Sequence, residues 1–144
     1  MPEADSLRAI GSLYQRMAAA AVMGNAAAYA ACYTEDGVLH PPHDLPIQGR
    51  DEVQTWAAAL FGTWNMRGHR VTMDDQRVGT TVAFSRYRAI GDFVPSAGGE
   101  SVPYDLKYID TLVRQPDDSW LIACHMWSSN VPGSSVWTKE VGTR

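Results

Sequence analysis

The segment YDLKYIDTLVRQPDDSWLIACHMWSSN, residues 104–130, predicts a β-hairpin, and this hairpin decides the kind of sheet the chain forms. Both arms are rich in aromatic and aliphatic residues, and the five residues between them, 115–119, are turn formers. Side chains alternate across a strand, so every second residue shares a face. In the first arm the predicted inward face carries Tyr104, Leu106, Tyr108, Asp110 and Leu112. In the second arm it carries Leu121, Ala123, His125 and Trp127.

Asp110 and His125 are acid–base residues on an otherwise apolar face. A buried carboxylate is costly unless it is paired, hydrogen-bonded or protonated. If residue 115 pairs with 120, Asp110 lies directly opposite His125; if 113 pairs with 120, His125 faces Tyr108 and Asp110 becomes its diagonal neighbour. Both registers keep the pair on one face, whereas a slip of a single residue would separate it.

The composition fits one ordinary globular domain over residues 1–144, with a core from about 6 to 130 and a loosely held tail from 131. Scattered basic residues and a net charge of −4 argue against a nucleic-acid partner. The acidic start lacks the features of a signal peptide, and we find no segment that would span a membrane. Cys32 and Cys124 lie far apart without metal-like spacing, which favours reduced thiols in a cytoplasmic protein.

The remaining patterns predict an α+β fold. Apolar residues at spacings of three and four predict a helix from Ser6 to Met23, and further helices are expected over Ala26–Tyr33 and Arg50–Trp64. A short strand is expected at Val38–His40, followed by a loop from 43 to 49. Longer strands are expected at about 69–78, 80–93, 102–114 and 119–130. This order predicts a strongly curved antiparallel sheet wrapped around three N-terminal helices, with an internal pocket.

Two stretches carry a family resemblance: YTEDGVLHPP at 33–42 followed by IQGRDEV at 47–53, and RQPDDSWLI at 114–122 followed by MWSS at 126–129. They resemble the SnoaL-like and ketosteroid-isomerase-like proteins of the nuclear-transport-factor-2-like superfamily, over about residues 6–130. The resemblance implies a cone-shaped barrel with a deep pocket, usually dimeric through the outer face of its sheet. On this chain the candidate dimer surface consists of Ile109, Val113, Ile122 and Met126.

The resemblance transfers only in part to the catalytic positions of ketosteroid isomerases. Asp110 falls at the position of their oxyanion-hole acid, a carboxylic acid held neutral so that it can donate a hydrogen bond. Their general-base aspartate corresponds to Pro41, which cannot act as a base. Their helical tyrosine falls near Met17, with Tyr14 one turn earlier. Steroid isomerisation by that mechanism is therefore not expected.

We predict Asp110, His125 and Tyr14 as catalytic residues, because an apposed carboxylate can orient an imidazole as a general base near neutral pH. The alternative is a buried pair with a purely structural role. The predicted ligand contacts are Met17, Leu39, His43, Trp56, Phe61, Tyr108 and Trp127. Arg86 and Arg88 are either a solvated sheet edge or anchors for an anion.

Two function classes remain open. The first is a cofactor-independent isomerase, cyclase or lyase that transfers protons on a hydrophobic, ring-bearing metabolite. The second is a non-catalytic module that binds a small ligand or serves as a dimeric scaffold. A metal site built from His40, His43, His125 and Asp110 uses common ligand types, but the spacing matches no known motif. We therefore expect neither metal nor cofactor.

Overall fold

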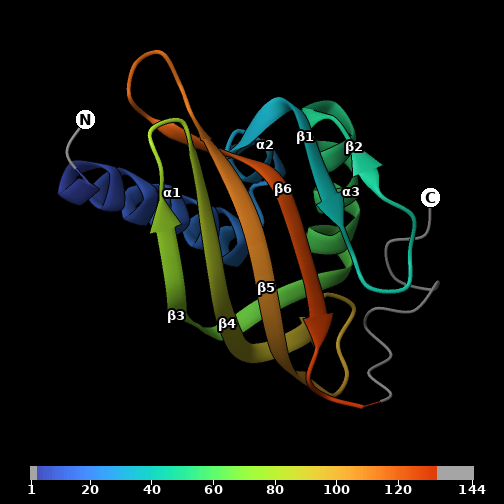
Figure 1. Cartoon of the computed structure of the whole chain (residues 1–144). Helices are drawn as coiled ribbons and strands as arrows, with labels where there is room; N and C mark the ends of the chain where they lie inside the picture. Colours follow the sequence, from blue (N-terminus) through green and yellow to red (C-terminus); the bar gives the residue numbers. More distant parts are fainter. Residues whose placement is uncertain (1–2, 133–144) are drawn as a thin grey trace.

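The computed structural model of the chain describes residues 3–132. Its helices are α1 (Glu3–Met23), α2 (Ala26–Ala30) and α3 (Arg50–Thr63). Its strands are β1 (Tyr33–His40), β2 (Ile47–Gln48), β3 (Trp64–Val78), β4 (Val82–Pro95), β5 (Val102–Arg114) and β6 (Trp120–Ser129). The helices lie against one side of a strongly curved sheet (Figure 1). This arrangement confirms the predicted α+β cone.

The sheet has the strand order β2-β1-β6-β5-β4-β3 and does not close on itself. The strands β3 to β6 pair antiparallel in chain order, as the patterns predict. The strand β1 pairs parallel with β6, which departs from the expected all-antiparallel sheet. A parallel pair requires a long crossover connection. Here the connection between β1 and β6 consists of the elements β2, α3, β3, β4 and β5.

The helices follow the apolar pattern, but their ends differ from the prediction. Helix α1 buries the stripe that contains Ile10, Leu13 and Met17, and Gly24 follows it in the left-handed conformation that commonly terminates helices. Helix α2 ends at Ala30, because residues from Tyr33 onward already pair with β6. Helix α3 ends one residue before the prediction, and β3 begins at once at Trp64 rather than near residue 69. Residues 47–48, expected in a loop, form β2 against β1.

The register of the β5–β6 hairpin places Asp110 directly opposite His125, which confirms the first of the two predicted registers at this point. At the turn, however, Arg114 pairs with Trp120, and the register shifts between Thr111 and Leu112. The shift leaves Ala123 as an extra residue in β6, a β-bulge.

The bulge reverses the predicted facing of the residues before it. Trp120 and Ile122 are buried, whereas Leu121 and Ala123 are only half-buried. The prediction that Ile122 lies on the outer surface beside Ile109 and Met126 is therefore wrong. The first arm keeps its predicted alternation, with Tyr104, Leu106, Asp110 and Leu112 buried.

Two further expectations concern the chain ends and membranes. Most of the predicted tail lies outside the described residues, since the description ends at residue 132. Within residues 3–132, no helix has both the length and the apolar character needed to cross a membrane.

Candidate functional site

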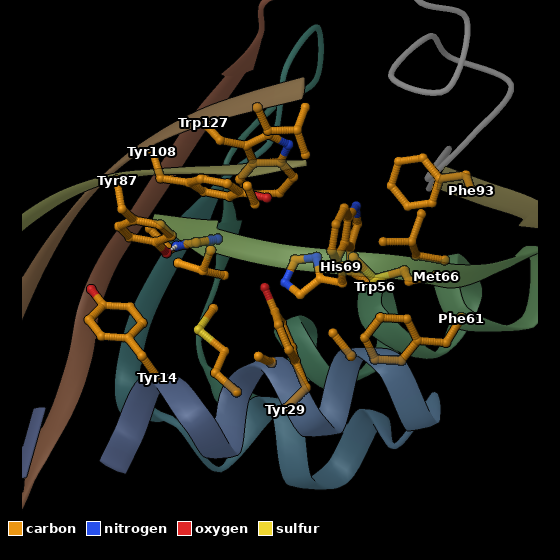
Figure 2. A pocket seen from close by; sticks show the side chains of 18 residues that line it. Tyr14, Tyr29, Trp56, Phe61, Met66, His69, Tyr87, Phe93, Tyr108 and Trp127 are labelled. Carbon is orange, nitrogen blue, oxygen red and sulfur yellow. Dashed lines mark hydrogen bonds between the residues drawn. The ribbon is translucent and has the colours of Figure 1, made fainter. Parts of the chain in front are cut away.

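A pocket lies between the concave face of the sheet and the helices (Figure 2). Its walls are largely apolar and aromatic, as is common for small-molecule sites. The lining side chains are Tyr14, Met17, Ala18, Ala21, Tyr29, Trp56, Leu60, Phe61, Met66, His69, Val71, Tyr87, Ala89, Phe93, Leu106, Tyr108, His125 and Trp127.

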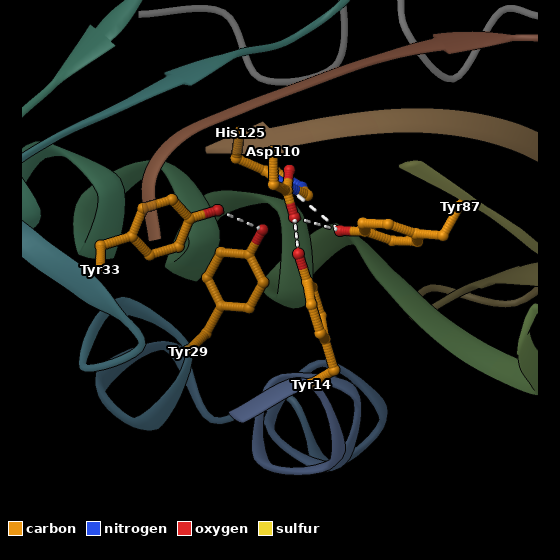
Figure 3. A network of polar contacts seen from close by, with 6 residues as sticks. All are labelled: Tyr14, Tyr29, Tyr33, Tyr87, Asp110 and His125. Atoms are coloured by element: carbon orange, nitrogen blue, oxygen red, sulfur yellow. Dashed lines mark hydrogen bonds and ion pairs between the residues drawn. The ribbon is translucent and has the colours of Figure 1, made fainter. Parts of the chain in front are cut away.

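Asp110 lies behind this wall, fully buried, and binds three polar groups (Figure 3). Its Oδ2 accepts hydrogen bonds from the Tyr14 hydroxyl at 2.6 Å and from the Tyr87 hydroxyl at 2.8 Å. Its Oδ1 lies 2.6 Å from Nδ1 of His125. All three partners can donate, and bonds this short are typical of acceptors that carry charge. Asp110 thus accepts both tyrosine bonds through Oδ2, and its Oδ1 is bonded to His125.

The contact with Asp110 fixes the orientation and tautomer of His125. If Nδ1 carries the proton and donates to the carboxylate, the other ring nitrogen, Nε2, keeps a lone pair. Among residues 3–132, Nε2 has no hydrogen-bond partner, and the ring lines the pocket. The ring stacks on Tyr108, with centroids 5.1 Å apart and an angle of 27° between the planes. In that tautomer the ring presents the Nε2 lone pair to the cavity.

A second tyrosine pair lies beside this cluster. The hydroxyls of Tyr29 and Tyr33 are 2.9 Å apart (Figure 3). Tyr33 is fully buried and lies outside the pocket lining, whereas Tyr29 lines the pocket. Either hydroxyl can donate to the other. When Tyr33 donates to Tyr29, the Tyr29 O–H is left to donate into the pocket, which Tyr29 lines.

Burial keeps these hydroxyls protonated. Desolvation raises the pKa of Tyr14, Tyr29, Tyr33 and Tyr87 above the ordinary value of tyrosine, and the charge of Asp110 adds to the effect. The same burial raises the pKa of Tyr108. Around neutral pH the phenols in this region are therefore hydrogen-bond donors and not bases.

The structure places most of the predicted site residues at this pocket. Tyr14 and His125 line it, and Asp110 contacts both from behind. Of the predicted ligand contacts, Met17, Trp56, Phe61, Tyr108 and Trp127 also line it.

Two predicted ligand contacts do not belong to the pocket lining. Leu39 is fully buried in the core, on β1 between β2 and β6, and is not among the side chains that line the pocket. His43 is exposed, in a loop where its φ of 61° turns the chain away, so alternation from Leu39 does not extend to it. These two assignments are corrected.

Three functional candidates were missed: Tyr87, Tyr29 and His69. The sequence does contain a pattern that indicates Tyr87. This residue stands between Arg86 and Arg88, which are exposed, so alternation along the strand turns its side chain to the opposite, inner face. Those arginines form ion pairs on the outer face, Arg86 with Asp74 and Arg88 with Asp105, and the Arg88 bonds lower the pKa of Asp105 to about 2. Tyr29 and His69 gave no comparable signal, since each depends on how α2 and β3 are placed in space.

The described part of the chain contains no group of three or more His, Cys, Asp or Glu side chains placed to hold a metal ion. His125 and Asp110 are in contact, but the contact is a hydrogen bond inside the cluster of tyrosines. The site as built therefore consists of an imidazole, a buried carboxylate and phenolic hydroxyls around an apolar cavity.

Comparison with known proteins agrees with this architecture. The model of the SnoaL-like domain family matches residues 2–124. The chain belongs to the SnoaL-like domain family. A comparison with curated proteins finds no match to this SnoaL-like chain.

Solved structures show the same fold for this SnoaL-like protein. A ketosteroid isomerase-like protein from Erwinia carotovora atroseptica is similar with a TM-score of 0.79 and 24% identity, over 88% of this chain and 97% of that one. A protein from Novosphingobium aromaticivorans assigned as a scytalone dehydratase gives 0.73 and 20%, over 87% and 84%. An NTF2-like protein with a cystatin-like fold from the same organism gives 0.70 and 18%, over 97% and 90%.

Proposed function

We propose that this SnoaL-like protein is a cofactor-independent enzyme that transfers protons on a hydrophobic, ring-bearing metabolite, with isomerisation, cyclisation, dehydration or addition of water as the outcome. The observation that carries the proposal is the buried Asp110–His125 pair, whose imidazole faces an apolar pocket. Two coupled acid–base groups at such a pocket are a recognised sign of a catalytic site.

In the proposed mechanism, His125 Nε2 removes a proton from a carbon next to a carbonyl group, or from water, and later returns it. Asp110 does not touch the substrate; it holds Nδ1 and stabilises the imidazolium that forms, so it is a positioning residue. Tyr14 and Tyr87 hold the carboxylate in place. The Tyr29 hydroxyl donates to the substrate oxygen as negative charge develops there.

Exchange of carbon-bound protons with solvent tests this function without a known substrate. The ring ketone 2-tetralone, incubated with the protein in D2O, is expected to exchange its α-protons faster than in buffer, as followed by NMR. A positioned base contributes about 100-fold or more, so His125→Gln should lose most of the protein-dependent rate. No exchange above buffer, or an unchanged rate in His125→Gln, would refute the proposal.

The alternative function is a non-catalytic module that binds a small ligand or acts as a scaffold. It is favoured by the proline at position 41, where ketosteroid isomerases carry their base, and by the complete internal bonding of Asp110. Native mass spectrometry of freshly purified protein separates the two functions when a ligand co-purifies. A ligand that is released chemically unchanged after long incubation favours the module, whereas an altered one favours the enzyme.

Two further expectations stay proposals. The first is a homodimer through the outer face of the hairpin, where Ile109 and Met126 pair across the strands and are each 48% exposed. A monomer at micromolar concentration in sedimentation would contradict it. The second is a cytoplasmic location, which the free thiols of Cys32 and Cys124 support.

A further inference from the structure

His69 is a second polar group in the wall of the pocket, and the mechanism above does not use it. It comes from β3, where the pairing with β4 shifts between Arg67 and Arg70 and Gly68 adopts a φ of 64°. Figure 2 shows the imidazole beside Trp56, with Tyr14 and Tyr87 to one side of it and Phe61, Met66 and Phe93 to the other. The cavity wall thus carries a second imidazole besides His125.

Tyr104 holds this imidazole. Its hydroxyl lies 2.7 Å from Nδ1 of His69, and its ring packs on Phe93 with centroids 4.5 Å apart. The opposite strand carries glycine at 91, where a Cβ would collide with the Tyr104 hydroxyl and approach the Arg67 carbonyl oxygen to 2.9 Å. The glycine leaves room for the tyrosine, and the tyrosine is only 4% exposed.

The tautomer of His69 follows from this contact. Among residues 3–132 the Tyr104 hydroxyl has one hydrogen-bond partner, His69 Nδ1, and a buried O–H that donates to nothing is costly. Tyr104 therefore donates, and Nδ1 accepts. Burial lowers the pKa of His69, so its ring is neutral near pH 7 and carries its proton on Nε2. Within the same residues, Nε2 has no hydrogen-bond partner.

We propose that His69 is a ligand-binding residue whose Nε2–H donates to a carbonyl oxygen of the ligand other than the group that meets His125, with Tyr104 as its positioning residue. This inference rests on the proposed function and deepens it by naming the substrate class. The ligand is a ring-bearing molecule with two oxygens: one meets His125, and the other is a carbonyl that meets His69.

A pair of naphthols tests the inference: 6-acetyl-2-naphthol carries the carbonyl, and 6-ethyl-2-naphthol lacks it. Calorimetric titration of the wild-type protein should show the acetyl compound binding about tenfold more tightly, the value of one well-placed hydrogen bond. In His69→Phe this preference should fall to about twofold or less, while the ethyl compound binds as before. His69→Gln keeps a side-chain donor and should restore part of the preference.

Tyr104→Phe provides the readout for the positioning role. In wild-type protein labelled with nitrogen-15 at histidine, long-range NMR spectra should show the proton of His69 on Nε2. In Tyr104→Phe the two tautomers should mix and the acetyl preference should shrink. A proton on Nδ1 in wild-type protein, equal affinity for the two naphthols, or a preference that survives in His69→Phe would overturn the inference.

Failure of the inference and failure of the proposed function give different results. An acetyl preference that depends on His69, found together with no 2-tetralone exchange, leaves this subsite standing in a binding module. Exchange that depends on His125, without an acetyl preference, leaves the enzyme standing and removes the subsite. Binding of neither naphthol at millimolar concentration overturns the ligand class.

Discussion

The substitution Asp110→Asn should inactivate the site while leaving the fold nearly intact, because the tautomer of His125 would change. Tyr14 and Tyr87 both donate to Oδ2, at 2.6 and 2.8 Å, so an asparagine carbonyl oxygen in that place keeps both bonds. The amide NH2 then occupies the place of Oδ1, 2.6 Å from His125 Nδ1. It can only donate, so Nδ1 must accept and the ring proton moves to Nε2. The base facing the pocket is lost.

The energies follow from the same contacts. Two hydrogen bonds to a charged acceptor become bonds to a neutral one, a loss of about 1 kcal/mol each and so about 2 kcal/mol in total. Asp110→Ala instead leaves the buried Tyr14 and Tyr87 hydroxyls without their acceptor, which should cost about 1–3 kcal/mol for each hydroxyl in addition to the cavity left by the side chain. The proton-exchange rate should nonetheless fall to a similar level in both variants, since an incorrect tautomer costs about 10⁴ in the best-known comparable site.

Urea unfolding followed by tryptophan fluorescence measures the two stabilities, and nitrogen-15 NMR of His125 reads the tautomer. Equal destabilisation by Asp110→Asn and Asp110→Ala would show that the tyrosine bonds are not kept in the asparagine variant. The reasoning is refuted if the His125 proton stays on Nδ1 in the asparagine variant.

Three further results are expected. Because burial lowers the pKa of His69, the unfolded chain binds a proton near pH 6.5 more readily than the folded chain does, so the free energy of unfolding should fall as the pH drops below about 6.5. Urea unfolding at several pH values should show a shallower decline in His69→Phe than in wild-type protein. Equal declines in the two proteins would contradict this prediction. The pKa values of all six tyrosines are raised in the folded protein, so the unfolded chain ionises first and the free energy of unfolding should fall above pH 10. The absorbance of tyrosinate at 295 nm should therefore rise together with the loss of circular dichroism. Tyrosinate formation near pH 10 in folded protein would contradict this prediction. Gly91→Ala should lower the free energy of unfolding by about 1–3 kcal/mol, because the added Cβ would clash with Tyr104. Gly62→Ala is the control in the same thermal unfolding assay, since a Cβ there meets nothing within 4 Å. Equal melting temperatures of the two variants would contradict this prediction.

The fold could be predicted from the sequence to the extent that alternation controls it. The first arm of the hairpin behaves as a regular strand, so its buried set, including Asp110, follows from residue order alone. The second arm does not, because a bulge at Ala123 reverses the facing of Ile122. No residue type marks that bulge; the packing of Trp120 and Ile122 into the core accompanies it.

The candidate site could be predicted where its residues lie on regular elements. Tyr14 and Met17 follow from helical spacing, and His125 from its pairing with Asp110. His43 could not be placed, since a left-handed residue in a loop ends any periodicity. His69 could not be found either, because it depends on an irregular register between β3 and β4 and on a ring that crosses from β5.

In the proposed mechanism, His125 Nε2 and the Tyr29 hydroxyl both face the reacting end of a ring-bearing ligand in this pocket. A crystal structure of the protein with 2-naphthol tests it most directly. We predict the naphthol rings between the aromatic walls, with the oxygen within hydrogen-bond distance of His125 Nε2 and Tyr29 Oη. A naphthol bound outside the pocket, or one in the pocket with its oxygen turned away from His125, would contradict the account.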